Sequence, residues 1–61
     1  DLPGTRGETL TPLRPAGIVL INGERVDVVS DGGYIDKGKD VEIVSVSGSR
    51  IVVRKIIKES D

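Results

Sequence analysis

The segment that decides the fold is IVLINGERVDVV, residues 18–29. Asn22-Gly23 at its centre is the strongest short-range signal for a β-hairpin, because a two-residue type I′ turn needs positive φ at both central positions. A turn here sets Ile21 opposite Glu24, and the period of two along each strand assigns every side chain to one face. The other predicted pairs are Leu20–Arg25, Val19–Val26 and Ile18–Asp27. The predicted core face holds Val19, Ile21, Val26 and Val28, and the outer face holds Ile18, Leu20, Arg25 and Asp27.

The composition limits how such a chain is held together. With 61 residues, one domain is the only sensible count. Tyr34 is the sole aromatic residue and there is no Met, so the core has to be built from Val, Ile and Leu. The absence of Cys and His excludes a disulfide framework and a Cys/His zinc site. Because β-branched side chains favour strands, an all-β fold stabilised by aliphatic packing is predicted.

Turn-forming residues divide the rest of the chain into short segments. Residues 1–6 are expected to be irregular and residues 7–11 to form a strand. The corner LRPAG follows at residues 13–17, where Pro15 is expected to hold Arg14 in an extended conformation.

A glycine between two lysines follows the loop SDGGY, residues 30–34. Such a lysine can carry a cofactor, contact an anionic ligand or form the polar tip of a turn. Pairing and alternation favour the turn, with Gly38 at its tight point and Lys37 and Lys39 in water. The residues of this segment that are expected in the core are Ile35 and Val41.

Two further strands are predicted at residues 40–47 and 50–56, joined around Gly48-Ser49. The expected core pairs are Val46–Ile51 and Val44–Val53. Val41 and Val44 cannot both point inward under strict alternation, so a bulge is expected near Glu42 or Ile43. The five strands predict an all-β, five-stranded OB-fold-type small barrel. The expected domain organisation is an irregular segment at 1–6, the barrel at 7–57 and a polar tail at 58–61.

A pattern of glycines, prolines and aliphatic residues runs over nearly the whole chain. It consists of Gly4, Gly7, Leu13-Arg14-Pro15, Gly17, Gly23, Asp27-Val28, Gly33, Ile35, Gly38, Val41 and Gly48. In this order the chain resembles the soluble carboxy-terminal domain of NfeD-like proteins. Two features depart from the family pattern: Pro12 stands where an acidic residue is expected, and the outward positions of Ile18 and Leu20 are usually polar.

The resemblance implies a place in a larger membrane protein. Family members end in an OB-type barrel, and longer members add an amino-terminal serine-protease domain. The implied partner is stomatin or another SPFH-domain membrane scaffold protein, with a homo-oligomer as a further option. The chain starts without Met and is expected to be a piece of a longer one, attached to the membrane only through segments outside it. The side of the membrane is taken as cytoplasmic.

The residues themselves argue against catalysis and nucleic-acid binding. Without His, the serines have no evident base, and the carboxylate pairs Glu24/Asp27 and Asp36/Asp40 are expected to be solvated hairpin charges. No catalytic residue, cofactor or metal site is predicted. A net charge of −1 and a single Tyr do not build the basic, aromatic groove with which OB folds bind single strands.

A protein interaction surface is the sharper hypothesis. The last strand is expected to present a cationic outer face consisting of Arg50, Val52, Arg54, Ile56 and Lys58. Its charges either bind acidic lipid headgroups or an acidic partner, or they protect an edge strand against mispairing. The candidate interaction residues are Ile18, Leu20, Arg25, Val52, Arg54 and Ile56. In the alternative interpretation, the amino-terminal segment, through Leu2 and Leu10, covers Ile18 and Leu20.

The predicted structural residues lie at the corner and the turns. They are Arg14, Pro15, Gly17, Asn22, Gly23, Gly38 and Gly48. The Arg14 guanidinium is expected to bind carbonyls or a carboxylate at the corner.

A biotinyl- or lipoyl-carrier-like domain is the rival interpretation, because DGGYIDKGKDVEI looks like a carrier hairpin. In carriers the modified lysine stands alone at a hairpin tip. The two tips predicted here, Asn22-Gly23 and Gly48-Ser49, carry no lysine.

Overall fold

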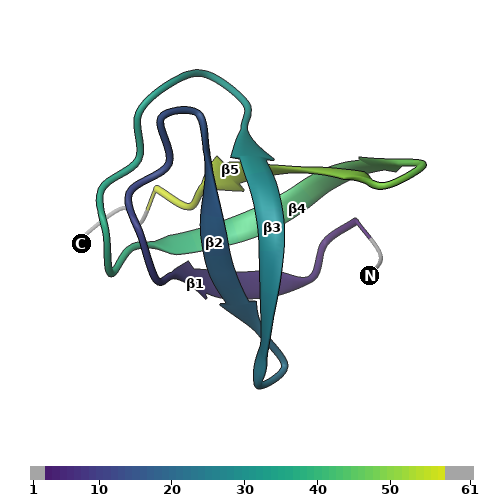
Figure 1. Cartoon of the computed structure of the whole chain (residues 1–61), viewed down its shortest axis with the longest axis horizontal. Coiled ribbons are helices and arrows are strands. Elements are labelled where there is room, and N and C mark those ends of the chain that lie inside the picture. The colour runs from purple at the N-terminus through teal and green to yellow at the C-terminus, as the bar shows by residue number, and fades with distance from the viewer. Residues whose placement is uncertain (1–2, 58–61) are drawn as a thin grey trace.

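The computed structural model describes residues 3–57, which form five strands (Figure 1). These are β1 (Arg6–Thr9), β2 (Ala16–Ile21), β3 (Glu24–Ser30), β4 (Asp40–Ser47) and β5 (Arg50–Lys55). They close into a barrel in the order β1-β2-β3-β5-β4. Only the β3–β5 pair is parallel. The predicted all-β, five-stranded OB-type barrel is thereby confirmed.

The β2–β3 hairpin has the register that the sequence predicts. Ile21 lies opposite Glu24, and the pairing continues without a shift to Ala16 opposite Val29. Asn22 and Gly23 have φ values of 53° and 82°, the positive values that a type I′ turn needs. The Asn-Gly turn therefore fixes which side chains of both strands enter the barrel.

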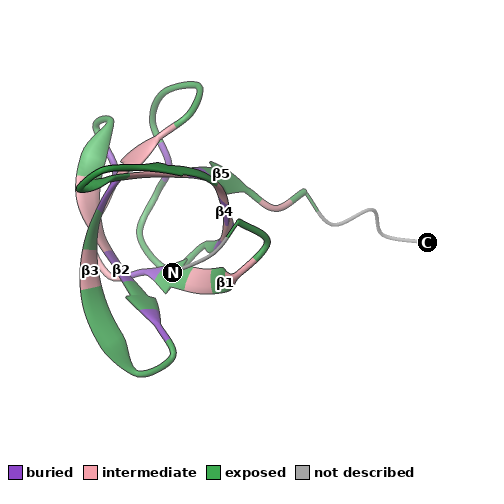
Figure 2. Ribbon diagram, turned by 90° about the vertical axis from the view of Figure 1, so that its right-hand side faces the viewer, coloured by how far each residue is buried: buried purple, intermediate pink, exposed green. Residues whose placement is uncertain are grey.

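The core is a single aliphatic cluster inside the barrel. Its buried members are Leu13, Val19, Ile21, Val28, Ile35, Val41, Ile43 and Val53. Val26 is half-buried and packs against them. Figure 2 shows the buried stretches on the strands that surround the interior and the exposed residues on the hairpins that extend from it. Leu13 and Ile35 enter from two loops joined by an isolated β-bridge, so Ile35 lies in the core as predicted.

The pairing of β4 with β5 differs from the prediction in one respect. Ile43, not Val44, lies opposite Val53, and the register shifts between Ile43 and Ser45. The predicted bulge exists but falls at Val44, so Ile43 is 1% exposed and Val44 is only half-buried. Alternation in the first half of β4 accounts for this, because Val41 and Ile43 then share the inner face.

Val46 is also not a core residue. It lies opposite Ile51 as predicted, yet it is 40% exposed. The reason is visible in Figure 1, where the β4–β5 hairpin projects beyond the barrel and no other strand covers its end. Pairing was predicted correctly there, but pairing alone does not bury a side chain.

The first strand and the turn before β4 complete the frame. β1 begins one residue earlier than predicted and ends at Thr9, after which the N–H groups of Leu10 and Thr11 both donate to the carbonyl of Ile18. Gly38 has a φ of 80°, and Lys37 and Lys39 on either side of it are exposed, as predicted. The polar tail at 58–61 lies outside the described residues.

Candidate interaction surface

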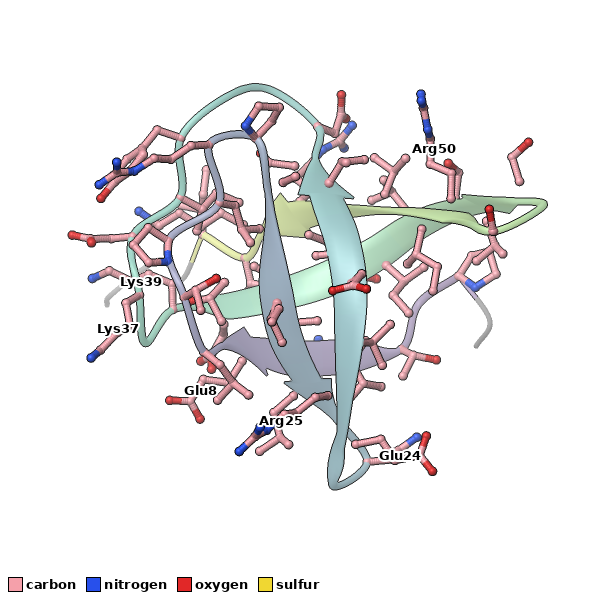
Figure 3. All side chains as sticks on the ribbon, in the orientation of Figure 1. Glu8, Glu24, Arg25, Lys37, Lys39 and Arg50 are labelled. Atoms are coloured by element: carbon pink, nitrogen blue, oxygen red, sulfur yellow. The ribbon has the colours of Figure 1, made fainter. Side chains whose placement is uncertain are left out.

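The outer face of the β2–β3 hairpin carries two aliphatic side chains among charges. Leu20 is 36% exposed and stands between Glu8 on β1 and Arg25 on β3, each directly opposite it. Ile18, opposite Asp27, is half-buried. Figure 3 shows Glu8 and Arg25 pointing outward near the hairpin. Both aliphatic residues thus face outward as predicted, with unequal exposure.

The segment after β1 is bonded to the backbone of Ile18. Thr11 accepts the Ile18 N–H on its Oγ1 over 3.0 Å, and Leu10, itself half-buried, donates its N–H to the Ile18 carbonyl over 2.8 Å. These bonds hold Leu10 and Thr11 beside the backbone of Ile18, and whether Leu10 covers the Ile18 side chain stays a prediction. Leu2, the other predicted covering residue, lies outside the described part of the chain.

A groove of about 490 Å³ continues this face toward the start of β5. It is lined by Ala16, Gly17, Ile18, Asp27, Val28, Val29, Ser49, Arg50 and Ile51. Its lining is mostly aliphatic, and one acidic and one basic residue border it. Such a site is suited to an aliphatic side chain whose neighbours are charged or polar. The sequence indicated that Ile18 belongs to a surface. It did not indicate that the β4–β5 hairpin forms one side of a groove beside Ile18.

The two β5 residues of the predicted surface, Val52 and Arg54, differ in exposure and in their contacts. Val52 is half-buried and lies opposite both Val29 and Ser45. The guanidinium of Arg54 makes an ion pair with Asp31, Nη2 to Oδ2 2.6 Å, in which both side chains are largely exposed. Exposed pairs of this kind contribute roughly 0–1 kcal/mol. Arg54 is thus occupied by a partner within the chain.

Ile56 belongs to a different part of the molecule. Its N–H donates to the carbonyl of Asp40, and it lines a second groove of about 380 Å³ together with Lys39 and Lys55. Figure 3 places Lys39 far from Arg50, on opposite sides of the barrel. Ile18 and Ile56, two members of the predicted surface, therefore line two different grooves, and Lys58 falls outside the described residues.

The LRPAG corner is structural, but its arginine makes a different contact from the one predicted. The Arg14 guanidinium lies over the ring of Tyr34, 5.7 Å from the centroid, and not on a carbonyl or a carboxylate. Tyr34 in turn donates its hydroxyl to Asp36 Oδ1 over 3.1 Å. The Arg14–Pro15 peptide bond is cis.

Gly17 is required at the corner for lack of space. A Cβ at this position would lie 2.5 Å from Leu13 Cδ2 and 2.7 Å from the Pro12 carbonyl oxygen. Gly17 therefore lets the beginning of β2 pack closely against the segment that places Leu13 in the core. Gly7 is equally constrained, because a Cβ there would lie 2.6 Å from the Leu20 carbonyl oxygen, and sequence reasoning did not assign it this role.

Residues 3–57 form neither a metal-binding cluster nor a membrane-spanning helix. Residues 3–57 contain no group of three or more Asp or Glu side chains placed to hold a metal ion. In the same range there is no helix with the length and hydrophobicity needed to span a bilayer.

Comparison with known proteins identifies the family. A family model described as the NfeD-like C-terminal, partner-binding domain matches residues 1–55. Membrane protein NfeD1b of Bacillus subtilis (strain 168) is 57% identical over 56 residues, which are 92% of this chain and 13% of that protein. The chain thus spans only a small part of this relative's length. The C-terminal domain of stomatin operon partner protein 1510-C from Pyrococcus horikoshii has 30% identity and a TM-score of 0.84, covering 90% of this chain and 88% of the other. The chain belongs to the family of NfeD-like C-terminal, partner-binding domains.

Proposed function

We propose that this domain is a non-catalytic protein-binding module of an NfeD-like membrane protein, and that its partner is a stomatin-type, SPFH-domain scaffold protein. The observation that carries the proposal is the position of Ile18 and Leu20. Both lie on the outer face of the barrel, and Ile18 lines the aliphatic groove that reaches β5.

The chemistry of this face supports protein binding more than any other role. Apolar side chains rimmed by charges are typical of protein interaction sites, where the aliphatic centre supplies affinity and the charges supply register. Glu8, Arg25 and Asp27 provide such a rim around Leu20 and Ile18. This face carries no Ser–base pair and no aromatic platform, so the proposal assigns it neither acyl transfer nor base stacking.

The partner class is supported by the relatives. The solved domain with the same fold belongs to a stomatin operon partner protein, and the relative from Bacillus subtilis is a membrane protein. In the proposed arrangement, membrane segments elsewhere in the parent protein hold this domain beside a membrane-attached scaffold. A protease domain in the parent would likewise lie outside this chain.

The test is binding of the domain to a purified stomatin-type SPFH domain, measured by isothermal titration. The double variant Ile18→Lys/Leu20→Lys places two charges on the proposed contact and should weaken binding by about tenfold or more. Val46→Lys is the matched control, because Val46 is an exposed aliphatic residue on the projecting β4–β5 hairpin. Equal affinity of the double variant and the control, with both folded, would contradict the proposed surface. Absence of binding by the unaltered domain within its parent protein would contradict the partner class.

A further inference from the structure

The loops at one end of the barrel present an arginine and an aromatic ring side by side. Leu13 and Ile35 form an antiparallel bridge in which each N–H donates to the carbonyl of the other, over 2.8 and 3.0 Å. Both of these side chains lie in the core, so alternation directs the next opposed pair, Arg14 and Tyr34, to the outside. The Arg14 guanidinium lies over the Tyr34 ring, and Tyr34 is 59% exposed. The backbone bonds of the bridge therefore hold this pair together at the surface.

The turn that follows Tyr34 is fixed by further hydrogen bonds. Asp36 Oδ1 accepts the Tyr34 hydroxyl over 3.1 Å and the Lys37 N–H over 3.0 Å. Thr9 donates its N–H to the Lys39 carbonyl over 2.9 Å, and its Oγ1 accepts the Lys39 N–H. Figure 3 shows Lys37 and Lys39 extending from this turn on the same side of the barrel. Because the backbone is already ordered, a partner that binds these lysines loses little conformational entropy of the turn.

The second groove, of about 380 Å³, begins at the same turn. Lys39 and Lys55 both belong to its lining and are exposed, as is Ile57. The hydrogen bond from the Ile56 N–H to the Asp40 carbonyl joins the end of β5 to the start of β4, and so keeps both lysines on one groove. Ammonium groups form strong hydrogen bonds with carboxylates, so this groove is suited to an acidic side chain.

The charges at this end of the molecule favour a protein partner over a lipid bilayer. The exposed cations of the bridge, the turn and the groove are Arg14, Lys37, Lys39 and Lys55, and the acids among them are Asp36 and Asp40. A bilayer attracts a protein through the summed charge of about four to eight basic residues, and the two carboxylates halve that sum here. A peptide can instead place each acidic group on a cation and avoid the carboxylates. Arginine and tyrosine are also the residues enriched at the centres of protein interfaces.

We propose that the loop-end surface, which consists of Arg14, Tyr34, Lys37, Lys39 and Lys55, docks an extended acidic segment of a partner protein. One carboxylate of the segment binds the Arg14 guanidinium while an adjacent aliphatic side chain packs on Tyr34. A second carboxylate enters the groove that Lys39 and Lys55 line, and Lys37 adds positive charge between the two positions. The site goes beyond the proposed function, since it shares no residue with the Ile18–Leu20 face and does not depend on what binds there.

The experiment uses the fluorescence of Tyr34, which is the sole aromatic residue of the chain and so reports on this surface alone. The probe is a short capped peptide of Glu, Asp and Leu, titrated into the 61-residue chain. A saturable change is expected with a dissociation constant between about 10 μM and 1 mM. The affinity should fall as salt is added, because the contacts are between exposed charges. The same peptide with Gln and Asn in place of its acids should leave the fluorescence unchanged.

Substitutions locate the contact. Arg14→Gln and the double variant Lys39→Gln/Lys55→Gln each remove charge from one half of the site and should weaken peptide binding by about tenfold, measured by isothermal titration. These side chains are exposed, so both variants should retain the fold and its unfolding transition. Arg6→Gln is the matched control, because it removes the same charge from an exposed residue at the other end of β1 from Thr9, and it should bind normally.

Several outcomes would overturn the proposal. One is equal binding of the acidic and the neutral peptide, and another is no binding of the acidic peptide up to about 10 mM. Unchanged affinity in both charge-removing variants is a third. Vesicles of equal parts phosphatidylcholine and phosphatidylserine that change the Tyr34 fluorescence, where the acidic peptide does not, would assign the surface to a bilayer and also overturn it.

Discussion

Thr9 and Asp36, 27 residues apart in the sequence, are joined by a hydrogen bond. Thr9 donates its Oγ1 hydrogen to the carbonyl oxygen of Asp36 over 2.7 Å, and the same Oγ1 accepts the N–H of Lys39 over 2.9 Å. Thr9 is 1% exposed and is the only polar residue among the described residues that is buried to this degree. One hydroxyl therefore fastens the turn around Gly38 to the end of β1.

Replacing that hydroxyl should cost stability without changing the shape of the side chain. Thr9→Val leaves the Asp36 carbonyl and the Lys39 N–H without their shared partner, and a buried polar group left unpaired costs roughly 1–3 kcal/mol. The measurement is the free energy of unfolding from urea titration. Thr5→Val, at a half-buried position just before β1, is the matched control and should change the free energy by much less. Equal losses in both variants would show that the Thr9 bonds do not carry the effect.

The position of the β4 bulge can be tested by truncation. Ile43 is 1% exposed and should lose roughly 2–5 kcal/mol of unfolding free energy on Ile43→Ala, because the cavity is enclosed by the core. Val46→Ala should remain within about 0.5 kcal/mol, since Val46 is 40% exposed on the projecting hairpin. Thermal or urea unfolding of the two variants gives the comparison. A larger loss of unfolding free energy for Val46→Ala than for Ile43→Ala would contradict the bulge at Val44.

Two glycines should respond differently to substitution because they are needed for different reasons. Gly17→Ala brings a Cβ within 2.5 Å of Leu13 Cδ2, so either the corner or Leu13 has to move, at roughly 1–3 kcal/mol. Gly48 lies in open space with a φ of 60°, a conformation that Asn tolerates, so Gly48→Asn should be nearly neutral. The check is the melting temperature of each variant. A stable Gly17→Ala protein with an unchanged spectrum would mean that the corner is less tightly packed than its distances indicate.

The carrier-like interpretation gains no support from the position of the lysines. Lys37 and Lys39 flank the Gly38 turn, which is tied to Thr9 through the N–H of Gly38 and the N–H of Lys39. Neither observed hairpin tip, at Asn22-Gly23 or at Gly48-Ser49, offers a lysine for attachment. The stretch that suggested a cofactor arm is thus explained as a connection that brings Ile35 and Val41 into the core.

Local chemistry made most of the fold predictable from the sequence. The Asn22-Gly23 turn determined the β2–β3 register, because only residues that accept positive φ fit there, and alternation from that turn correctly separated Val19 and Ile21 from Ile18 and Leu20. The aliphatic, glycine-punctuated composition determined the fold class. These are short-range constraints, which a sequence expresses directly.

The candidate surface, by contrast, was decided by the tertiary structure. Closure of the barrel places Arg50 and Ile51 in one groove with Ile18 and places Ile56 in a second groove. It also pairs the Arg54 guanidinium with the Asp31 carboxylate. The bulge at Val44 and the overhang of the β4–β5 hairpin decided which aliphatic residues are buried. Alternation along one strand specifies which face a side chain takes. What covers that face, and which edge stays unpaired, depends on strands distant in sequence and on how far each one overlaps its neighbour.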